Sequence, residues 1–300
     1  MTTKKIGAGL TVLMTLVVAA LRITIVPQLQ SNGQTSVSYI VIGAIALALV
    51  ILFFLMGKTA EVPRVRRKAI IPAAAAGVLF GATLVLSTVW DIVQLAVNNI
   101  SPPPGDYVTG NIDWILLIGI FVFGVLGGVF MIQLCLRWIT SGHSRSSALV
   151  YAALIPPLWM WMRLARYELS YASAVDVSKS FYDFVMFILA LLFLFGFARY
   201  ISGIGRQKRL PFFAAGTAIL ALSGTLAHYF FQITNNADGL AATVLLGPAD
   251  LTLGIFALLM VYVLAFAERE AGEDELRAEL AEAEGQQEQS AEPDQGAGLN

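Results

Sequence analysis

The chain has 300 residues, of which 57% are hydrophobic and only 13% are charged. A soluble core of this size cannot hide so much apolar surface, so the composition excludes an ordinary soluble domain and indicates a membrane protein. The net charge of -1 conceals an asymmetry, because the last 33 residues hold 11 acidic and 2 basic side chains and the remainder is basic.

Eight stretches are long and apolar enough to cross a bilayer. About 20 apolar residues in a helix span about 30 Å of hydrocarbon, and a helix satisfies its own backbone hydrogen bonds where lipid cannot. The predicted spans cover residues 6–27, 38–57, 69–97, 112–136, 147–166, 180–201, 210–232 and 244–267. The first could instead be a signal peptide cleaved near Ala19-Ala20, since it follows Lys4 and Lys5. The pattern predicts an all-α polytopic membrane protein, a bundle of about eight transmembrane helices.

The distribution of basic residues predicts the orientation. If eight spans alternate sides, 15 of the 19 Lys and Arg residues fall on one side, which the positive-inside tendency places in the cytoplasm. Both termini would then be cytoplasmic, in a protein of the plasma membrane. Anionic lipid and topology explain these basic loops, so no nucleic acid is expected as a partner.

Residues 268–300 are predicted to form an acidic cytoplasmic tail. Ala, Glu and Leu favour a helix as far as about Glu284, and Gly, Gln, Glu and Pro beyond it are typical of disorder. Such a tail could bind a basic cytoplasmic or membrane protein, or could simply be solvated.

A shift of about 140 residues aligns the two halves of the membrane region. The aligned pairs include Arg22 with Arg163, Asp113 with Asp250, and Pro72 with Pro211. They predict two parallel four-helix repeats, residues 1–137 and 138–267, with chance similarity of apolar helices as the alternative. By this pseudo-symmetry, Arg22 would meet Asp250 and Arg163 would meet Asp113.

Ionisable residues within the predicted spans share one side. Charge in a span is costly and tends to face the bundle interior or water. The predicted outer halves or the outer interface contain Arg22, Asp91, Asp113, Arg163, Arg166, Glu168, Asp183, His228 and Asp250. They predict a polar cavity that opens outward, in which the arginines supply positive charge and the aspartates pair with them or coordinate a cation. The alternative is structural, with arginines that reach the headgroups and aspartates that cap helices.

The fifth predicted span contains the most distinctive local sequence. Pro156 and Pro157 remove two backbone donors and are expected to kink or open the helix. Beyond them, Trp159, Arg163 and Arg166 share a helical face that could bind an anionic or aromatic ligand. An aromatic belt with arginines that reach the headgroups is the alternative.

Two glycine spacings predict close helix packing. These are Gly77-x-x-x-Gly81 and Gly124-x-x-x-Gly128, where the missing side chains let two backbones approach. Packing within the bundle is the expected use, and a dimer interface is the alternative.

Groups for common catalytic chemistry are missing from the sequence. There are two histidines, His143 and His228, and one cysteine, Cys135, so no zinc site, disulfide or Cys-His pair is expected. No G-x-S-x-G or P-loop motif occurs, and no catalytic residue, metal or cofactor is predicted. One remote enzyme alternative is an intramembrane aspartyl protease. Two short segments resemble that family's paired-aspartate motifs, namely Phe181-Tyr182-Asp183 and Gly247-Pro248-Ala249-Asp250. The second segment departs from the family's Gly-x-Gly-Asp.

The sequence leaves two main functions open. One is binding or translocation of a small polar or anionic solute, or of a lipid headgroup, through the outward cavity. The other is a non-transporting membrane sensor or assembly subunit that acts through partner proteins. A carrier needs polar groups near the midplane, whereas the predicted inner half is almost wholly apolar, which weakens the transport hypothesis.

Overall fold

The computed structural model describes residues 2–32, 49, 51, 67–98, 111–141, 151–171, 177–202, 209–234 and 247–265. All regular secondary structure in this part of the chain is helical. The labelled helices are α1 (Thr2–Asn32), α3 (Arg67–Asn98), α4 (Asn111–Ser141), α6 (Ile155–Tyr171), α7 (Val177–Ile201) and α8 (Leu210–Ile233). A further helix, Pro248–Ala265, is called the C-terminal helix below.

Six of the described helices contain a segment long and apolar enough to cross a membrane. These segments are Lys5–Thr24, Ile70–Val93, Trp114–Thr140, Tyr182–Ile201, Leu210–Ile233 and Pro248–Ala265. They coincide, within a few residues, with six of the eight predicted spans. The chain is therefore a multi-pass helical membrane protein. The predicted second span, 38–57, lies outside the described residues apart from Leu49 and Ile51.

The proline pair of the fifth predicted span marks the start of a helix. Residues 153 and 154 form a turn, and α6 begins at Ile155, so both prolines lie in its first turn. A first turn suits proline because the backbone donors there have no partner within the helix. The predicted break in the helix is confirmed, and α6, with 17 residues, begins and ends later than the predicted span at 147–166.

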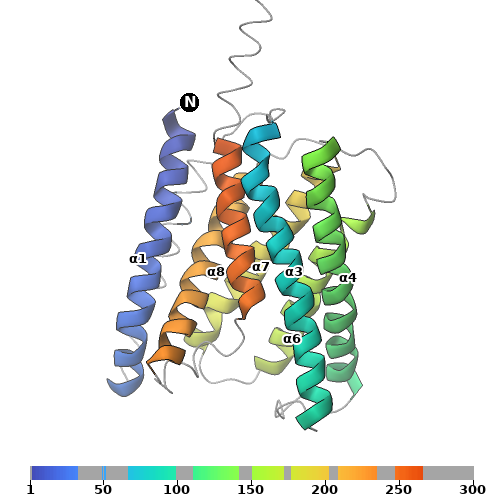
Figure 1. The fold of residues 1–300 in the computed structure, drawn as a ribbon. Coiled ribbons are helices and arrows are strands. Elements are labelled where there is room, and N and C mark those ends of the chain that lie inside the picture. Colours follow the sequence, from blue (N-terminus) through green and yellow to red (C-terminus); the bar gives the residue numbers. More distant parts are fainter. Residues whose placement is uncertain are drawn as a thin grey trace, which may run out of the picture.

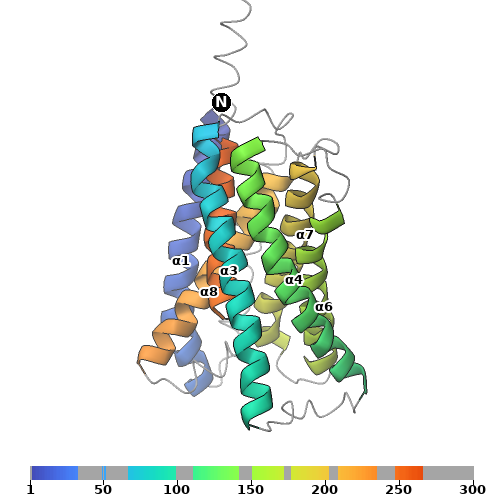
Figure 2. The same cartoon turned by 45° about the vertical axis from the view of Figure 1, so that its right-hand side comes forward.

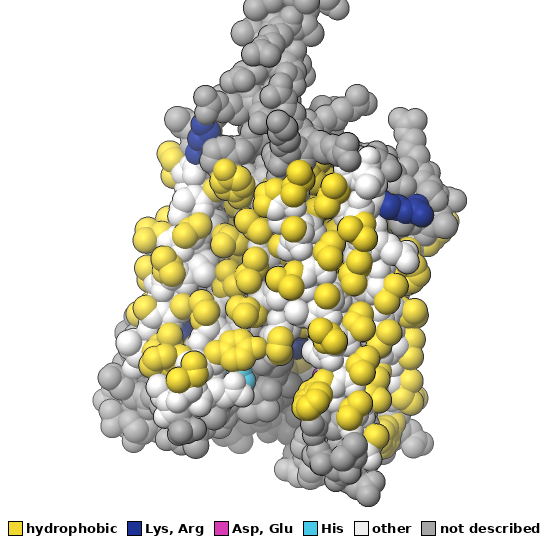
Figure 3. Space-filling view, viewed as in Figure 1, with side chains coloured by type: hydrophobic (Ala, Val, Ile, Leu, Met, Phe, Trp, Pro, Cys, Tyr) yellow, Lys and Arg dark blue, Asp and Glu magenta, His cyan; other side chains and the backbone are white. Residues whose placement is uncertain are grey.

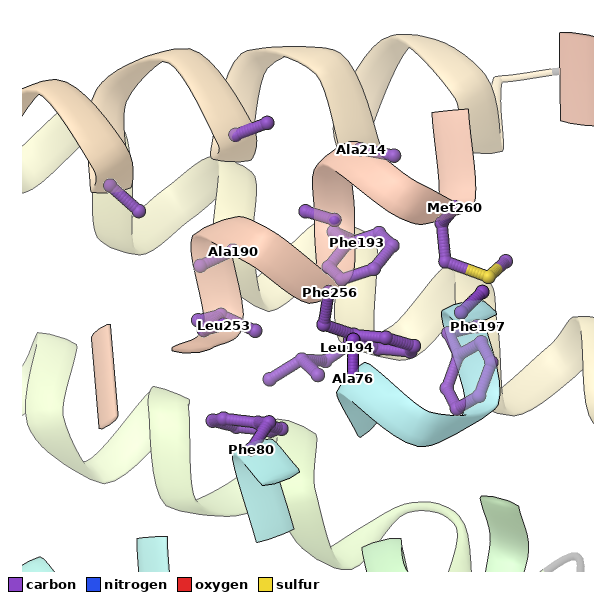
Figure 4. Packing of buried hydrophobic residues seen from close by; sticks show 14 of the residues in the cluster. Ala76, Phe80, Ala190, Phe193, Leu194, Phe197, Ala214, Leu253, Phe256 and Met260 are labelled. Atoms are coloured by element: carbon purple, nitrogen blue, oxygen red, sulfur yellow. The ribbon is translucent and has the colours of Figure 1, made fainter. Parts of the chain in front are cut away.

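The helices pack side by side in one bundle (Figures 1 and 2), and the C-terminal helix lies between α8 and α3 in the view of Figure 1. Each helix contacts the next in a continuous series: α3 packs on α4, α4 on α6, α6 on α7, α7 on α8, and α8 on α1. The C-terminal helix joins them, because the fully buried ring of Phe256 lies parallel to that of Phe80 on α3 and edge-on to that of Phe197 on α7 (Figure 4). Phe193 of α7 completes this aromatic layer.

The outer surface of the bundle is apolar. Figure 3 shows hydrophobic side chains over most of the described face. Large hydrophobic residues of α3 and α4 are exposed, including Leu86, Trp90, Ile115 and Ile118. An exposed apolar surface of this extent is what contact with lipid requires, because water would penalise it.

The predicted glycine spacings bring α3 and α4 into close contact. A Cβ atom placed on Gly81 would lie 2.6 Å from the backbone oxygen of Gly128, and one placed on Gly128 would lie equally close to the oxygen of Gly81. A Cβ on Gly124 would lie 2.6 Å from the hydroxyl of Thr88 on α3. The expectation that these glycines pack helices within the bundle is confirmed.

Candidate functional site

Charged side chains gather at one end of the bundle. In Figure 1 this is the lower end, where α1, α3 and α8 finish and the C-terminal helix begins. Arg22 lies near the end of its membrane-spanning segment, whereas Asp183 and Asp250 lie near the starts of theirs. Because α1 runs in the opposite direction to α7 and to the C-terminal helix, these positions fall at the same depth. We call Arg22, Arg163, Asp183 and Asp250 the polar cluster.

Arg163 and Asp250 form a closed ion pair between α6 and the C-terminal helix. The two terminal nitrogens of Arg163 donate to the two carboxylate oxygens of Asp250 at 2.6 and 3.0 Å. The backbone N–H of Gly247 also donates to Asp250, at 2.9 Å. This carboxylate reaches back from the third helical position to the helix start, so it caps the helix as well as binding the arginine. A planar two-point contact is the strongest form of this pair.

Aromatic rings hold the guanidinium of Arg163 in place. Its central carbon lies 4.9 Å from the ring centre of Trp159, one turn earlier on α6, and 4.9 Å from that of Phe187 on α7. A cation is attracted to the face of an aromatic ring, and more strongly where water is excluded. Trp159 is buried and also contacts Phe80. Arg163 is therefore fixed by one carboxylate and two rings.

Arg22 and Asp183 form a more open ion pair between α1 and α7. Their closest nitrogen and oxygen atoms are 3.8 Å apart, beyond hydrogen-bond distance, although both side chains are buried. The guanidinium of Arg22 also lies over the ring of Tyr182, 4.7 Å from its centre. The Tyr182 hydroxyl is buried and has no hydrogen-bond partner in the described part of the chain. A polar group in this position has unused capacity to bind.

The two pairs form one electrostatic unit. Asp183 interacts with Arg163 and Asp250 as well as with Arg22, so charges from α1, α6, α7 and the C-terminal helix act on this carboxylate. Two arginines and two aspartates give the cluster no net charge. A cluster without net charge can be buried within the membrane, whereas an unpaired charge there would be costly.

The other predicted site residues surround this cluster less closely. Asp91 is exposed and interacts electrostatically with Arg163. Arg166 is half-buried on α6, and His228 is half-buried on α8, with its ring 5.9 Å from that of Tyr229. Asp113 belongs to α4, but its side chain lies outside the described residues.

The partners of the charged residues differ from those that the pseudo-symmetry predicted. Asp250 pairs with Arg163 rather than with Arg22, and Arg22 pairs with Asp183. The predicted pairing of Arg22 with Asp250 was wrong, because it assumed that a charge meets its counterpart in the other half of the chain. The C-terminal helix instead places Asp250 against α6, its neighbour in the same half.

Sequence reasoning predicted Trp159 but missed two other aromatic residues of the site. Tyr182 and Phe187 lie beside the two guanidinium groups, and neither was predicted to take part. Two signals were available. Tyr182 directly precedes Asp183, and Phe187 follows Asp183 by four residues, so Asp183 and Phe187 share a face of α7.

The two aspartates of the protease-like segments lie within electrostatic range of each other. A protease dyad requires two carboxylates that share one proton. Here each carboxylate is paired with its own arginine, so the two carboxylates are not paired with each other. Among the described residues, no group of three or more His, Cys, Asp or Glu side chains could hold a metal ion.

Comparison of the chain with protein-family models, with curated proteins and with solved structures finds no match.

Proposed function

We propose that the protein binds a small polar or anionic molecule, a solute or a lipid headgroup, at the polar cluster. One observation carries this proposal: the Arg22–Asp183 pair is buried but not closed, whereas the Arg163–Asp250 pair beside it is closed. A cation held 3.8 Å from its counter-ion and over the ring of Tyr182 keeps donors available for a further acceptor. The closed pair would support the site rather than bind the ligand.

The proposed topology has eight spans, with both termini in the cytoplasm and the polar cluster on the outer side. Its support is the distribution of basic residues together with the direction of the helices. α1 and α3 run the same way through the bundle (Figure 1), and a span at 38–57 between them accounts for this. Leu49, within that stretch, is 3.5 Å from a Cβ placed on Gly216 of α8. The division into repeats 1–137 and 138–267 rests on the sequence matches alone.

A second candidate is a membrane sensor or assembly subunit that transports nothing. The observation that favours it is the aromatic layer of Phe80, Phe193, Phe197 and Phe256, which is fully buried and, through Phe80, contacts Trp159 beside Arg163. A carrier must open a path to both sides, whereas a receptor for a ligand or a protein need not. Binding is therefore proposed ahead of translocation.

A thermal-shift screen of the purified protein tests the binding proposal. The panel contains inorganic anions, carboxylates, amino acids, nucleosides and lipid headgroups. The test variant is Arg22→Gln with Asp183→Asn, which removes the open pair without leaving a lone charge. The control is Glu168→Gln, which changes an exposed carboxylate of α6. We expect one ligand class to raise the melting temperature of the wild type and the control but not that of the double variant.

Two other outcomes contradict the proposal. If the double variant is stabilised as much as the wild type, the ligand binds elsewhere. If no compound shifts the melting temperature, the partner-protein hypothesis is preferred. Deletion of residues 272–300 tests that hypothesis, because loss of the acidic tail should then abolish recovery of a partner in a pull-down. Unchanged recovery would reject a role for the tail.

A further inference from the structure

The two ion pairs of the polar cluster differ in what it costs to open them. Opening Arg163–Asp250 breaks two hydrogen bonds at 2.6 and 3.0 Å and releases the carboxylate that caps the C-terminal helix. Opening Arg22–Asp183 breaks no hydrogen bond, because the pair is 3.8 Å apart. Separation therefore begins at Arg22. The ring of Tyr182 stays under the guanidinium and keeps part of its stabilisation.

Charge balance limits what can enter at Arg22. The cluster is neutral as it stands, so one added anion would leave one excess negative charge at a site where Arg22 and Asp183 are both less than a tenth exposed. Such a charge is too costly to bury alone. Among the described residues, Arg163 is the other arginine that acts on Asp183, and both of its terminal nitrogens already bond to Asp250, so it could accept a displaced Asp183 carboxylate only as a shared partner.

We propose that the site binds a small carboxylate together with one proton, so that the ligand replaces Asp183 on Arg22 and Asp183 becomes a neutral carboxylic acid. This inference rests on the proposed binding function. The proton comes from water and is held on a carboxylate oxygen of Asp183, and no other covalent bond forms or breaks. The neutral acid can then donate a hydrogen bond, which the carboxylate could not.

The groups around Asp183 are compatible with this exchange. Arg22 on α1 and Arg163 on α6 favour its charged form, whereas Asp250 on the C-terminal helix opposes it. Tyr229 of α8 interacts with Asp250, and Tyr182 lies next to Asp183 in α7. When a ligand carboxylate takes over Arg22, the repulsion by Asp250 and by the ligand itself acts on Asp183. Protonation removes both repulsions.

A monocarboxylate fits the site better than a dianion. Its charge and shape reproduce those of the Asp183 group that it displaces, and one proton restores neutrality. A sulfate or a doubly charged phosphate would leave a further negative charge after the same proton had bound. The buried Tyr182 hydroxyl, which has no partner among the described residues, offers a second donor to the ligand.

Isothermal titration calorimetry with acetate, lactate and benzoate tests the inference, with sulfate for comparison. Repeating each titration in buffers of different ionisation enthalpy counts the protons taken up per ligand. We expect uptake of about one proton, and affinity that rises about tenfold for each pH unit of acidification while Asp183 is charged in the free protein and neutral in the complex. The measurements cover about pH 6 to about pH 8, where these probes stay ionised.

Two variants assign the proton to Asp183. Asp183→Asn should bind the carboxylate without proton uptake and without dependence on pH, whereas Glu168→Gln should behave like the wild type. If Asp183→Asn does not fold, infrared difference spectra of the wild type replace it. Addition of the ligand should then produce the carbonyl band of a protonated carboxylic acid.

Each failure has a distinct meaning. Carboxylate binding without proton uptake, or uptake that persists in folded Asp183→Asn, overturns the inference and leaves the binding function standing. Tighter binding of sulfate than of every carboxylate also overturns it. If carboxylates do not bind but another class in the thermal-shift screen does, only the inference fails. If nothing binds in either experiment, both proposals fail.

Discussion

Removing one partner of the Arg163–Asp250 pair is expected to destabilise the bundle strongly, and removing both is expected to restore much of the loss. Asp250→Asn leaves a guanidinium that cannot lose its charge, and Arg163→Gln leaves a carboxylate that is almost fully buried. In the folded protein, the Arg163 side chain is 15% exposed and that of Asp250 is 1% exposed. Breaking a buried pair on one side costs about 3–5 kcal/mol, because the remaining charge has lost its partner.

The structure ranks the two single variants. Arg163 keeps the rings of Trp159 and Phe187 when Asp250 is replaced, so Asp250→Asn should lie near the lower limit, about 3 kcal/mol. Among the residues that the structure describes, Asp250 keeps only the hydrogen bond from the Gly247 N–H when Arg163 is replaced, so Arg163→Gln should cost more at neutral pH. The double variant should lose less than the sum, and the coupling should be about 2–3 kcal/mol.

Acidification distinguishes the two variants. The lone carboxylate in Arg163→Gln can take up a proton and become neutral, which relieves the cost of burying it. The lone arginine in Asp250→Asn stays charged at every accessible pH. The stability lost by Arg163→Gln should therefore be smaller at about pH 5 than at about pH 8, whereas the loss in Asp250→Asn should not shrink on acidification.

Titration of the protein in mixed micelles with a denaturing detergent measures these losses, with tryptophan fluorescence as the signal of unfolding. All four proteins of the cycle are compared at both pH values. Losses that simply add would show that the two side chains do not interact. A loss in Arg163→Gln that grows on acidification would contradict the assignment of a lone buried carboxylate.

Three further substitutions test the packing of the bundle. Gly128→Ala should cost about 1–3 kcal/mol, because its Cβ would lie 2.6 Å from the Gly81 oxygen. The control is Gly9→Ala, whose Cβ would meet nothing within 4 Å and which should not destabilise the protein. Equal effects of the two substitutions in unfolding titrations would refute the close contact of α3 and α4. Phe256→Ala should cost about 3–5 kcal/mol, because the ring is fully buried in the aromatic layer, and a loss below about 1 kcal/mol would show that the layer is not packed. Thr252→Val removes a hydroxyl contact of 2.6 Å to α3 and should cost about 0.6 kcal/mol, the usual value between membrane helices; a stabilised variant would contradict this contact.

The sequence predicted the membrane helices well, because their signal is local. Length and apolar character locate a span without knowledge of its neighbours, and six predicted spans match described helices. The prolines before Trp159 likewise predicted an interruption of the helix, which lies just before α6, since a missing backbone donor acts within one helical turn. The glycine spacings indicated close packing, although the sequence could not show that Gly81 faces Gly128.

The partners in the site were beyond the sequence because they depend on which helices are neighbours. Arg22, Arg163, Asp183 and Asp250 were all recognised as costly charges in a membrane, and the structure brings these four together. Their pairing follows from the packing of the helices, which places Asp250 of the C-terminal helix beside Arg163 of α6 and Asp183 of α7 near Arg22 of α1, and no local pattern indicates this packing. Tyr182 was missed for the same reason, since an aromatic residue in an apolar helix is ordinary until a cation lies over it.

Labelling of a cysteine introduced beside the open pair tests most directly the claim that a polar cluster is reached from outside the cell. Tyr182→Cys is half-buried next to Asp183, and the native Cys135, which is fully buried, serves as the unreactive control. A membrane-impermeant anionic thiol reagent is expected to modify Tyr182→Cys on intact cells. Modification only from the cytoplasmic side, or from neither side, would contradict it.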